Sequence, residues 1–88
     1  MEQPLNLLGL IKLVSQDIED CLDTADQLIG LGLEPWRTLQ TATALDDLRR
    51  RYIREAIADG ATVLMVSGVA MLSPNAIREI LKQQVSQA

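Results

Sequence analysis

An uncharged run from residue 61 to residue 72 constrains the fold more than any other part of the sequence. Turn-forming pairs bound it, Asp59-Gly60 before it and Ser73-Pro74 after it. It therefore falls short of the roughly 20 apolar residues that a membrane helix needs. We expect this run to be buried in a protein core, where such a segment fits a helix or an inner strand equally well.

The neighbouring segments favour a helix for this run. Amphipathic helical patterns lie on both sides of it, and no other segment could pair with a single strand. Its β-branched residues, such as Val63 and Val66, favour a strand instead. The sequence therefore predicts a helix over residues 61–72 and leaves open whether the whole run is helical.

The spacing of apolar residues predicts three further helices. From Leu7 to Ile29 such residues recur every three or four positions, which indicates one long helix over residues 4–30. A similar pattern predicts a second helix over residues 35–59. A fourth helix is predicted over residues 74–86, after the uncharged run.

Residues that start or stop helices lie between these segments. Ser73 suits the N-cap of the fourth helix, and Gly60 suits the end of the second. Either Gly30 or Gly32 suits the end of the first helix, which could also break near Ser15 because serine is a good N-cap. The short turn after the first helix predicts that it forms an antiparallel hairpin with the second.

The predicted fold is an all-α single domain over residues 1–88. A long antiparallel helical hairpin packs against an apolar third helix and a short capped fourth helix. A helix that is apolar all round must be covered on every side, and a chain of 88 residues has a small interior. We therefore expect a second copy to complete the cover in an isologous homodimer. The expected dimer contact comprises Leu5, Leu8, Leu10, Met65 and Met71.

Charge is unevenly distributed along the chain. Residues 1–35 carry one lysine against seven acids, whereas residues 36–88 carry seven basic residues against five acids. Such a distribution favours neutralisation between the two halves, either within the fold or within a dimer. Across the hairpin we expect Asp17 to pair with Arg49.

Side chains for catalysis and metal binding are scarce. The chain has no histidine, and the acids of the first helix lack the glycine turn and spaced ligands of a calcium loop. The single cysteine, Cys21, adjoins the apolar stripe and is expected to be a small core residue. The sequence therefore predicts no enzyme, no cofactor and no metal site. One cysteine and a start without the basic residues of a signal peptide favour a reducing cytoplasm.

Four arginines clustered over residues 49–54 of the predicted second helix raise the alternative of nucleic-acid binding. Asp46 precedes Arg50 by four positions and Asp47 precedes Arg51 by four, which favours a ladder of ion pairs. Acids beside the arginines would also repel a phosphate backbone. The alternative is a small DNA-binding transcriptional regulator that uses the fourth helix and the Arg49–Arg54 cluster. Its expected contacts are Arg49, Arg50, Arg54, Asn75, Arg78 and Lys82.

The main functional prediction is a non-enzymatic interaction or regulatory module that acts as a small helical homodimer. Its expected partners are a second copy of the chain and another protein. Nucleic acid is the alternative partner, and no membrane partner is expected.

Overall fold

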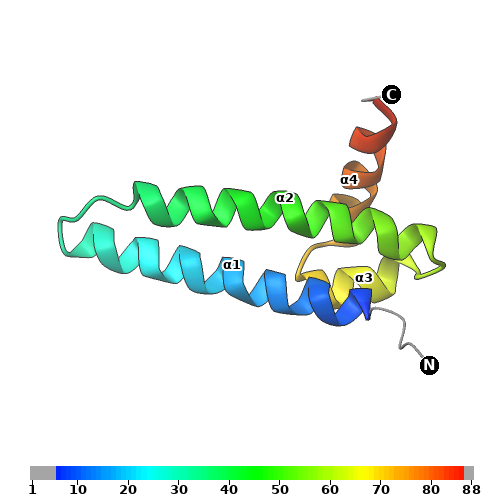
Figure 1. The fold of residues 1–88 in the computed structure, drawn as a ribbon, viewed down its shortest axis with the longest axis horizontal. Helices are drawn as coiled ribbons and strands as arrows, with labels where there is room; N and C mark the ends of the chain where they lie inside the picture. Colours follow the sequence, from blue (N-terminus) through cyan, green and yellow to red (C-terminus); the bar gives the residue numbers. More distant parts are fainter. Residues whose placement is uncertain (1–5, 87–88) are drawn as a thin grey trace.

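The computed structural model describes residues 6–86, with side chains up to Gln83, and in that range the protein has four helices and no strand (Figure 1). They are α1 (Leu7–Gly30), α2 (Trp36–Ala58), α3 (Val63–Ala70) and α4 (Pro74–Ser86). The predicted all-α fold is confirmed. In Figure 1, α1 and α2 form the antiparallel hairpin, and α3 and α4 lie at the end away from its turn. We call the turn end the tip of the hairpin and the opposite end its base.

Local signals set both ends of α1. The side-chain oxygen of Asn6 accepts a hydrogen bond from the backbone nitrogen of Gly9 at 3.0 Å, which caps the first turn. The helix then runs unbroken through Ser15 to Gly30. Gly32 has φ +76°, a left-handed conformation that glycine adopts without a steric penalty, and it ends the helix as predicted.

The third helix is shorter than predicted and spans only eight residues. It begins after Thr62, whose hydroxyl accepts a hydrogen bond from the backbone nitrogen of Met65 at 3.1 Å. It ends at Met71, which takes the left-handed conformation, with φ +59°, although it is not a glycine. At 1.5 Å per residue α3 is about 12 Å long and α1 about 36 Å, so α3 can lie along only about a third of the hairpin.

The fourth helix begins as the sequence predicts. The hydroxyl of Ser73 accepts a hydrogen bond from the backbone nitrogen of Ala76 at 3.1 Å, and Pro74 occupies the first helical position. The axis of α4 points away from the hairpin, as Figure 1 shows. Within residues 6–86 no helix combines the length and the apolarity that crossing a bilayer requires.

The hydrophobic core lies at the base, where all four helices meet. Within a single chain the third helix is covered on one side only, because Val66 and Ala70 are buried while Leu64 is 73% exposed. Only one side of α3 therefore contributes to the core. Burying one aliphatic side chain of this size stabilises a fold by about 1.5–3 kcal/mol. The buried cluster comprises Ile11, Ile53, Ala56, Val66, Ala70, Ile77 and Ile80.

The apolar stripe of α1 continues beyond the part of the hairpin that α3 covers. Leu22 and Ile29 follow Ile11 by 11 and 18 residues, which are close to three and five whole turns, so all three lie on one side of the helix. Ile11 is fully buried, but Leu22 is 44% and Ile29 59% exposed. In the second half of the stripe Ala25 is buried, but Leu22 and Ile29 stay partly exposed because α3 is too short to cover them.

Candidate functional site

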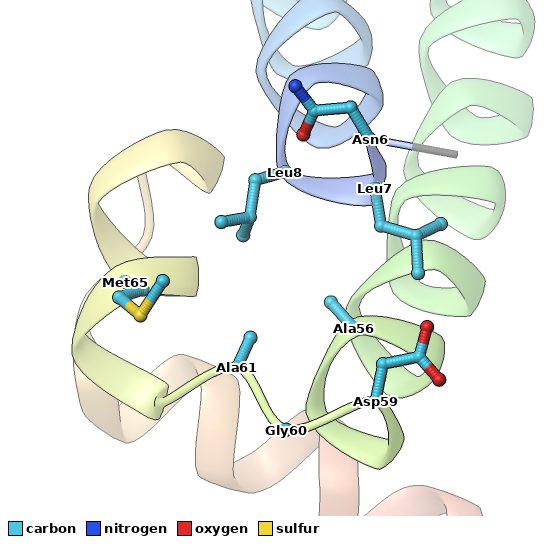
Figure 2. Close-up of a pocket in the computed structure, with 8 residues that line it drawn as sticks. All are labelled: Asn6, Leu7, Leu8, Ala56, Asp59, Gly60, Ala61 and Met65. Atoms are coloured by element: carbon cyan, nitrogen blue, oxygen red, sulfur yellow. The ribbon is translucent and has the colours of Figure 1, made fainter. Parts of the chain in front are cut away.

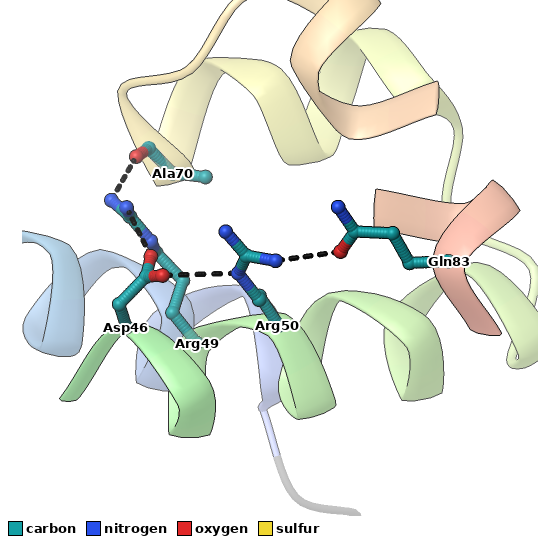
Figure 3. Close-up of polar contacts among 5 residues, drawn as sticks. All are labelled: Asp46, Arg49, Arg50, Ala70 and Gln83. Atoms are coloured by element: carbon teal, nitrogen blue, oxygen red, sulfur yellow. Dashed lines mark hydrogen bonds and ion pairs between the residues drawn. The ribbon is translucent and has the colours of Figure 1, made fainter. Parts of the chain in front are cut away.

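The arginines of α2 connect this helix to α3 and α4 (Figure 3). Arg49 donates hydrogen bonds to Asp46 Oδ1 at 2.8 Å and to the backbone oxygen of Ala70, in the last turn of α3, at 3.0 Å. Arg50 donates to Asp46 Oδ2 at 3.0 Å and to the side-chain oxygen of Gln83 in α4 at 2.6 Å. A cation at the carbonyl end of a helix also interacts favourably with the helix dipole.

Two of the ion-pair expectations are wrong. Asp46 binds both neighbouring arginines, whereas Asp47 and Arg51 form no ion pair within residues 6–86. The expected pair between Asp17 and Arg49 is not formed either, because Asp17 is exposed and Arg49 turns towards the last turn of α3. The arginines therefore join elements at the base, and charges do not pair across the hairpin at these positions.

Three of the other four residues of the DNA-binding alternative also contact groups within the protein. Arg78 donates to the side-chain oxygen of Asn75 at 2.9 Å, and Lys82 Nζ lies 3.5 Å from a carboxylate oxygen of Glu79. Arg54 is half-buried, and its Nε has no hydrogen-bond partner among the described residues. The hollow of about 320 Å³ between α2 and α4 contains both acids and arginines. These residues do not gather into a surface of unbalanced positive charge.

The outer side of α3 forms an uncharged apolar surface. We call it the α3 surface and define it by Leu64, Met65, Gly68 and Met71. Leu64 is largely exposed, and the two methionines are about half exposed. The sequence from residue 60 to residue 77 contains no charged residue, so α3 contributes no charge to this surface.

A groove of about 310 Å³ extends the α3 surface towards α1 and α2. Figure 2 shows Leu8 of α1 and Met65 of α3 pointing towards the same space, above the turn around Gly60 and Ala61. The structure thus brings together two residues of the expected dimer contact. Met71 follows at the other end of α3.

The remaining two residues of the expected contact do not join the α3 surface. Leu10 is half-buried and follows Leu8 by two positions, which places it on a different side of α1. Leu5 lies outside the described residues.

Gly68 is the unusual residue of the α3 surface. It is exposed in the middle of α3, and a Cβ atom added there would meet no atom within 4 Å. Glycine in a helix interior is about 1 kcal/mol less favourable than alanine, and no packing within the described chain requires it here. Sequence reasoning missed this residue, because only the structure shows that the space beside it is empty.

A second apolar surface lies at the hairpin tip. We call it the tip surface and define it by five large exposed residues: Leu22, Ile29, Leu31, Leu33 and Trp36. Beside Trp36, which is 64% exposed, a shallow hollow of about 410 Å³ is also lined by Leu39, Gln40 and Thr43. Sequence reasoning missed this surface, since periodicity places Leu22 and Ile29 on one apolar side of the helix and does not show whether another element covers that side.

Groups for metal binding do not assemble in the described part of the chain. Within residues 6–86 no three His, Cys, Asp or Glu side chains are placed to hold a metal ion together. Cys21, expected in the core, is a free cysteine and only half-buried. No protein family, curated protein or solved structure was found to match this chain. The two apolar surfaces are therefore the candidate functional sites.

Proposed function

We propose that the protein is a non-enzymatic protein–protein interaction module that acts as a homodimer through its α3 surface. The observation that carries this proposal is the exposure of Leu64, Met65 and Met71 on one short helix. Contiguous apolar surfaces are uncommon on monomers and often mark interaction sites. Methionine suits such a site because its flexible side chain adapts to a partner. The proposal places the protein in a reducing cytoplasm, where its single cysteine needs no disulfide partner.

The absence of charge on the α3 surface supports a second copy as the partner. In an isologous dimer the same surface meets itself, so any charge on it would lie close to an identical charge. The uncharged α3 surface avoids that repulsion. Gly68 adds a further argument, because the lack of a side chain would let two α3 helices approach closely where they cross.

The groove beside Met65 enlarges the surface available to the proposed contact. A stable interface of standard size takes about 800 Å² from each partner, more than one side of an eight-residue helix provides. The groove extends the surface onto Leu7 and Leu8 of α1, with Asp59 as the one charged residue that lines it. We therefore place the two-fold axis near Gly68 and the edge of the contact in the groove.

Sedimentation equilibrium at micromolar concentration tests the dimer. We expect the wild-type protein to sediment as a dimer, and Leu64→Glu and Met65→Glu to sediment as monomers because each would place a charge in the contact. Leu13→Glu is the matched control, because Leu13 is an exposed leucine of α1 outside the α3 surface. A wild-type protein that sediments only as a 9.7 kDa species would contradict the proposal.

Gly68→Ala provides a second test, in which the stability of the monomer should rise while the affinity of the dimer falls. The methyl group should stabilise the monomer by up to about 1 kcal/mol through helix propensity. The same group should weaken the dimer, because two methyl groups would meet at the crossing point. Gly30→Ala is the control, since its added Cβ also meets no atom within 4 Å but lies in the last turn of α1. Unchanged dimer affinity in Gly68→Ala would place the contact elsewhere.

DNA binding through α4 and the α2 arginines is the weaker proposal. Arg49 and Arg50 already bind Asp46 and groups of α3 and α4, so that phosphate would have to displace those contacts. Salt-sensitive retention on a heparin column would favour it, since phosphate binding weakens steeply as salt is added.

A further inference from the structure

We infer that the tip surface binds a basic amphipathic helix of a partner protein. This surface lies at the opposite end of the hairpin from α3 (Figure 1). It shares no residue with the α3 surface, so the inference does not depend on the proposed dimer. Three properties of the tip support it: the side of the hairpin that is bare, the hollow beside Trp36, and the surrounding charge.

The side of the hairpin that is exposed at the tip is the same side that packs against α3 and α4 at the base. On α1, Leu22 and Ile29 share a side with Ile11, which lies in the core with residues of α3 and α4. On α2, Trp36 and Thr43 precede Arg50 by 14 and 7 residues and so lie on nearly the same side as Arg50, which contacts α4. This side of the hairpin therefore already accepts short helices from its own chain, and it continues uncovered to the tip.

The hollow beside Trp36 can receive a side chain from such a helix. Trp36 and Leu39 line it with apolar side chains, and Gln40 and Thr43 complete the lining. Its volume of about 410 Å³ accommodates one large apolar side chain. Binding energy at interfaces is concentrated in such anchors, and tryptophan is among the residues most often found there.

The charge around the tip specifies a basic partner. Asp26 follows Leu22 by four residues and precedes Ile29 by three, so it lies beside both on α1. Asp23 and Glu34 add negative charge near the tip. Arg37 is the only basic residue between positions 13 and 48, and it lies about 100° around α2 from Trp36. Opposite charges across an interface select the partner and accelerate its binding.

The same acids disfavour other occupants. A nucleic acid or an anionic lipid surface would bring more negative charge to Asp23, Asp26 and Glu34. A second copy bound tip to tip would place these acids near their own equivalents. A helix with an apolar side and flanking lysine or arginine residues matches both the apolar and the charged features of the tip.

Trp36 provides a direct measurement, because it is the only tryptophan in the chain and it lies on the tip surface. The probe is a tryptophan-free amphipathic peptide of leucine and lysine, about 14 residues or four helical turns long. We expect its binding to shift the Trp36 emission to shorter wavelengths, and its affinity to fall as salt is added. The control peptide has glutamate in place of each lysine and should not bind.

Variants of the protein locate the binding site. Ile29→Glu and Asp26→Lys should each weaken binding of the basic peptide by roughly tenfold or more, as expected for loss of an anchor or a complementary charge. Leu64→Glu on the α3 surface is the matched control and should bind the peptide as the wild type does. This control also separates the two proposals, since it tests the tip in a protein that is expected to be monomeric.

Two outcomes would overturn the inference. One is equal affinity of the peptide for wild type, Ile29→Glu and Asp26→Lys, with circular dichroism showing all three folded. The other is a Trp36 emission shift that grows with protein concentration alone and is lost in Ile29→Glu, which would assign the tip to a second copy of the chain.

Discussion

Ser15 is a polar residue on the buried side of α1. Its side chain is fully buried, and its hydroxyl oxygen has no hydrogen-bond partner among residues 6–86. A buried hydroxyl loses its hydration without compensation, which is unfavourable. The serine that could have broken the helix is thus held inside it, because Ile11, Val14 and Ile18 pack around the same side of α1.

Ser15→Ala should therefore stabilise the protein. We expect the free energy of unfolding to rise by about 1 kcal/mol, because alanine removes the unpaired hydroxyl and has the higher helix propensity. Urea denaturation at one fixed protein concentration measures it, since dimerisation would make stability depend on concentration. Ser67→Ala is the control and should lower the free energy of unfolding, because the hydroxyl of Ser67 donates a hydrogen bond to the backbone oxygen of Leu72. A lower stability for Ser15→Ala would show that this hydroxyl has a partner in solution.

At the level of helices, Asp46 holds the base together through the arginines beside it. Its two carboxylate oxygens orient Arg49 towards the last turn of α3 and Arg50 towards α4. Asp46 thereby positions the contact of α2 with α3 and the contact of α2 with α4. Surface ion pairs contribute little on their own, but these arginines are half-buried and also bind other helices.

Asp46→Ala should therefore cost more stability than the same change at the adjacent acid. We expect a loss of about 1–2 kcal/mol, because two hydrogen bonds to charged groups are removed and Arg49 is left without its orienting partner. Asp47→Ala should change the free energy of unfolding by less than about 0.5 kcal/mol, since Asp47 is exposed. Thermal denaturation of both variants measures the difference. Equal losses in the two variants would contradict the role given to Asp46.

The helices were predictable from sequence where their signals are local. Ser73 caps α4, and Gly32 ends α1, because capping and left-handed turns depend on a few adjacent residues. The end of α3 was not predictable in this way, because Met71 takes a left-handed conformation that methionine seldom adopts. The pairing of Arg49 with Ala70 was not predictable either, since it depends on where α3 ends in space.

At the level of the whole molecule, the number of layers changes along the long axis. The base has α3 and α4 against the hairpin, whereas the tip consists of α1 and α2 and the turn between them (Figure 1). Hydrophobic periodicity shows which side of a helix faces inward, and it placed Leu22 and Ile29 on the same side as Ile11 correctly. It does not show whether another element is long enough to cover that side. The tip surface therefore could not be predicted from sequence.

This change in layering predicts a gradient of local stability. Amide hydrogens of α1 and α2 near the tip should exchange roughly tenfold faster or more than those near Ile11 and Ile53, because local opening there breaks fewer apolar contacts. Hydrogen exchange followed by mass spectrometry measures it, with Leu64→Glu as the control for protection by a dimer. Uniform protection along both helices would show that the tip is covered in solution.

The separation of the two surfaces has a consequence for avidity. The molecule is 46 Å long, with the tip surface at one end and α3 near the other. A dimer joined through α3 would carry two tip surfaces, each at the far end of its own hairpin. A partner assembly with two suitably spaced helices could bind both tips at once, which can raise its apparent affinity by about a hundredfold or more over a single site. The length of the hairpin would then determine the spacing between partner helices that permits this gain.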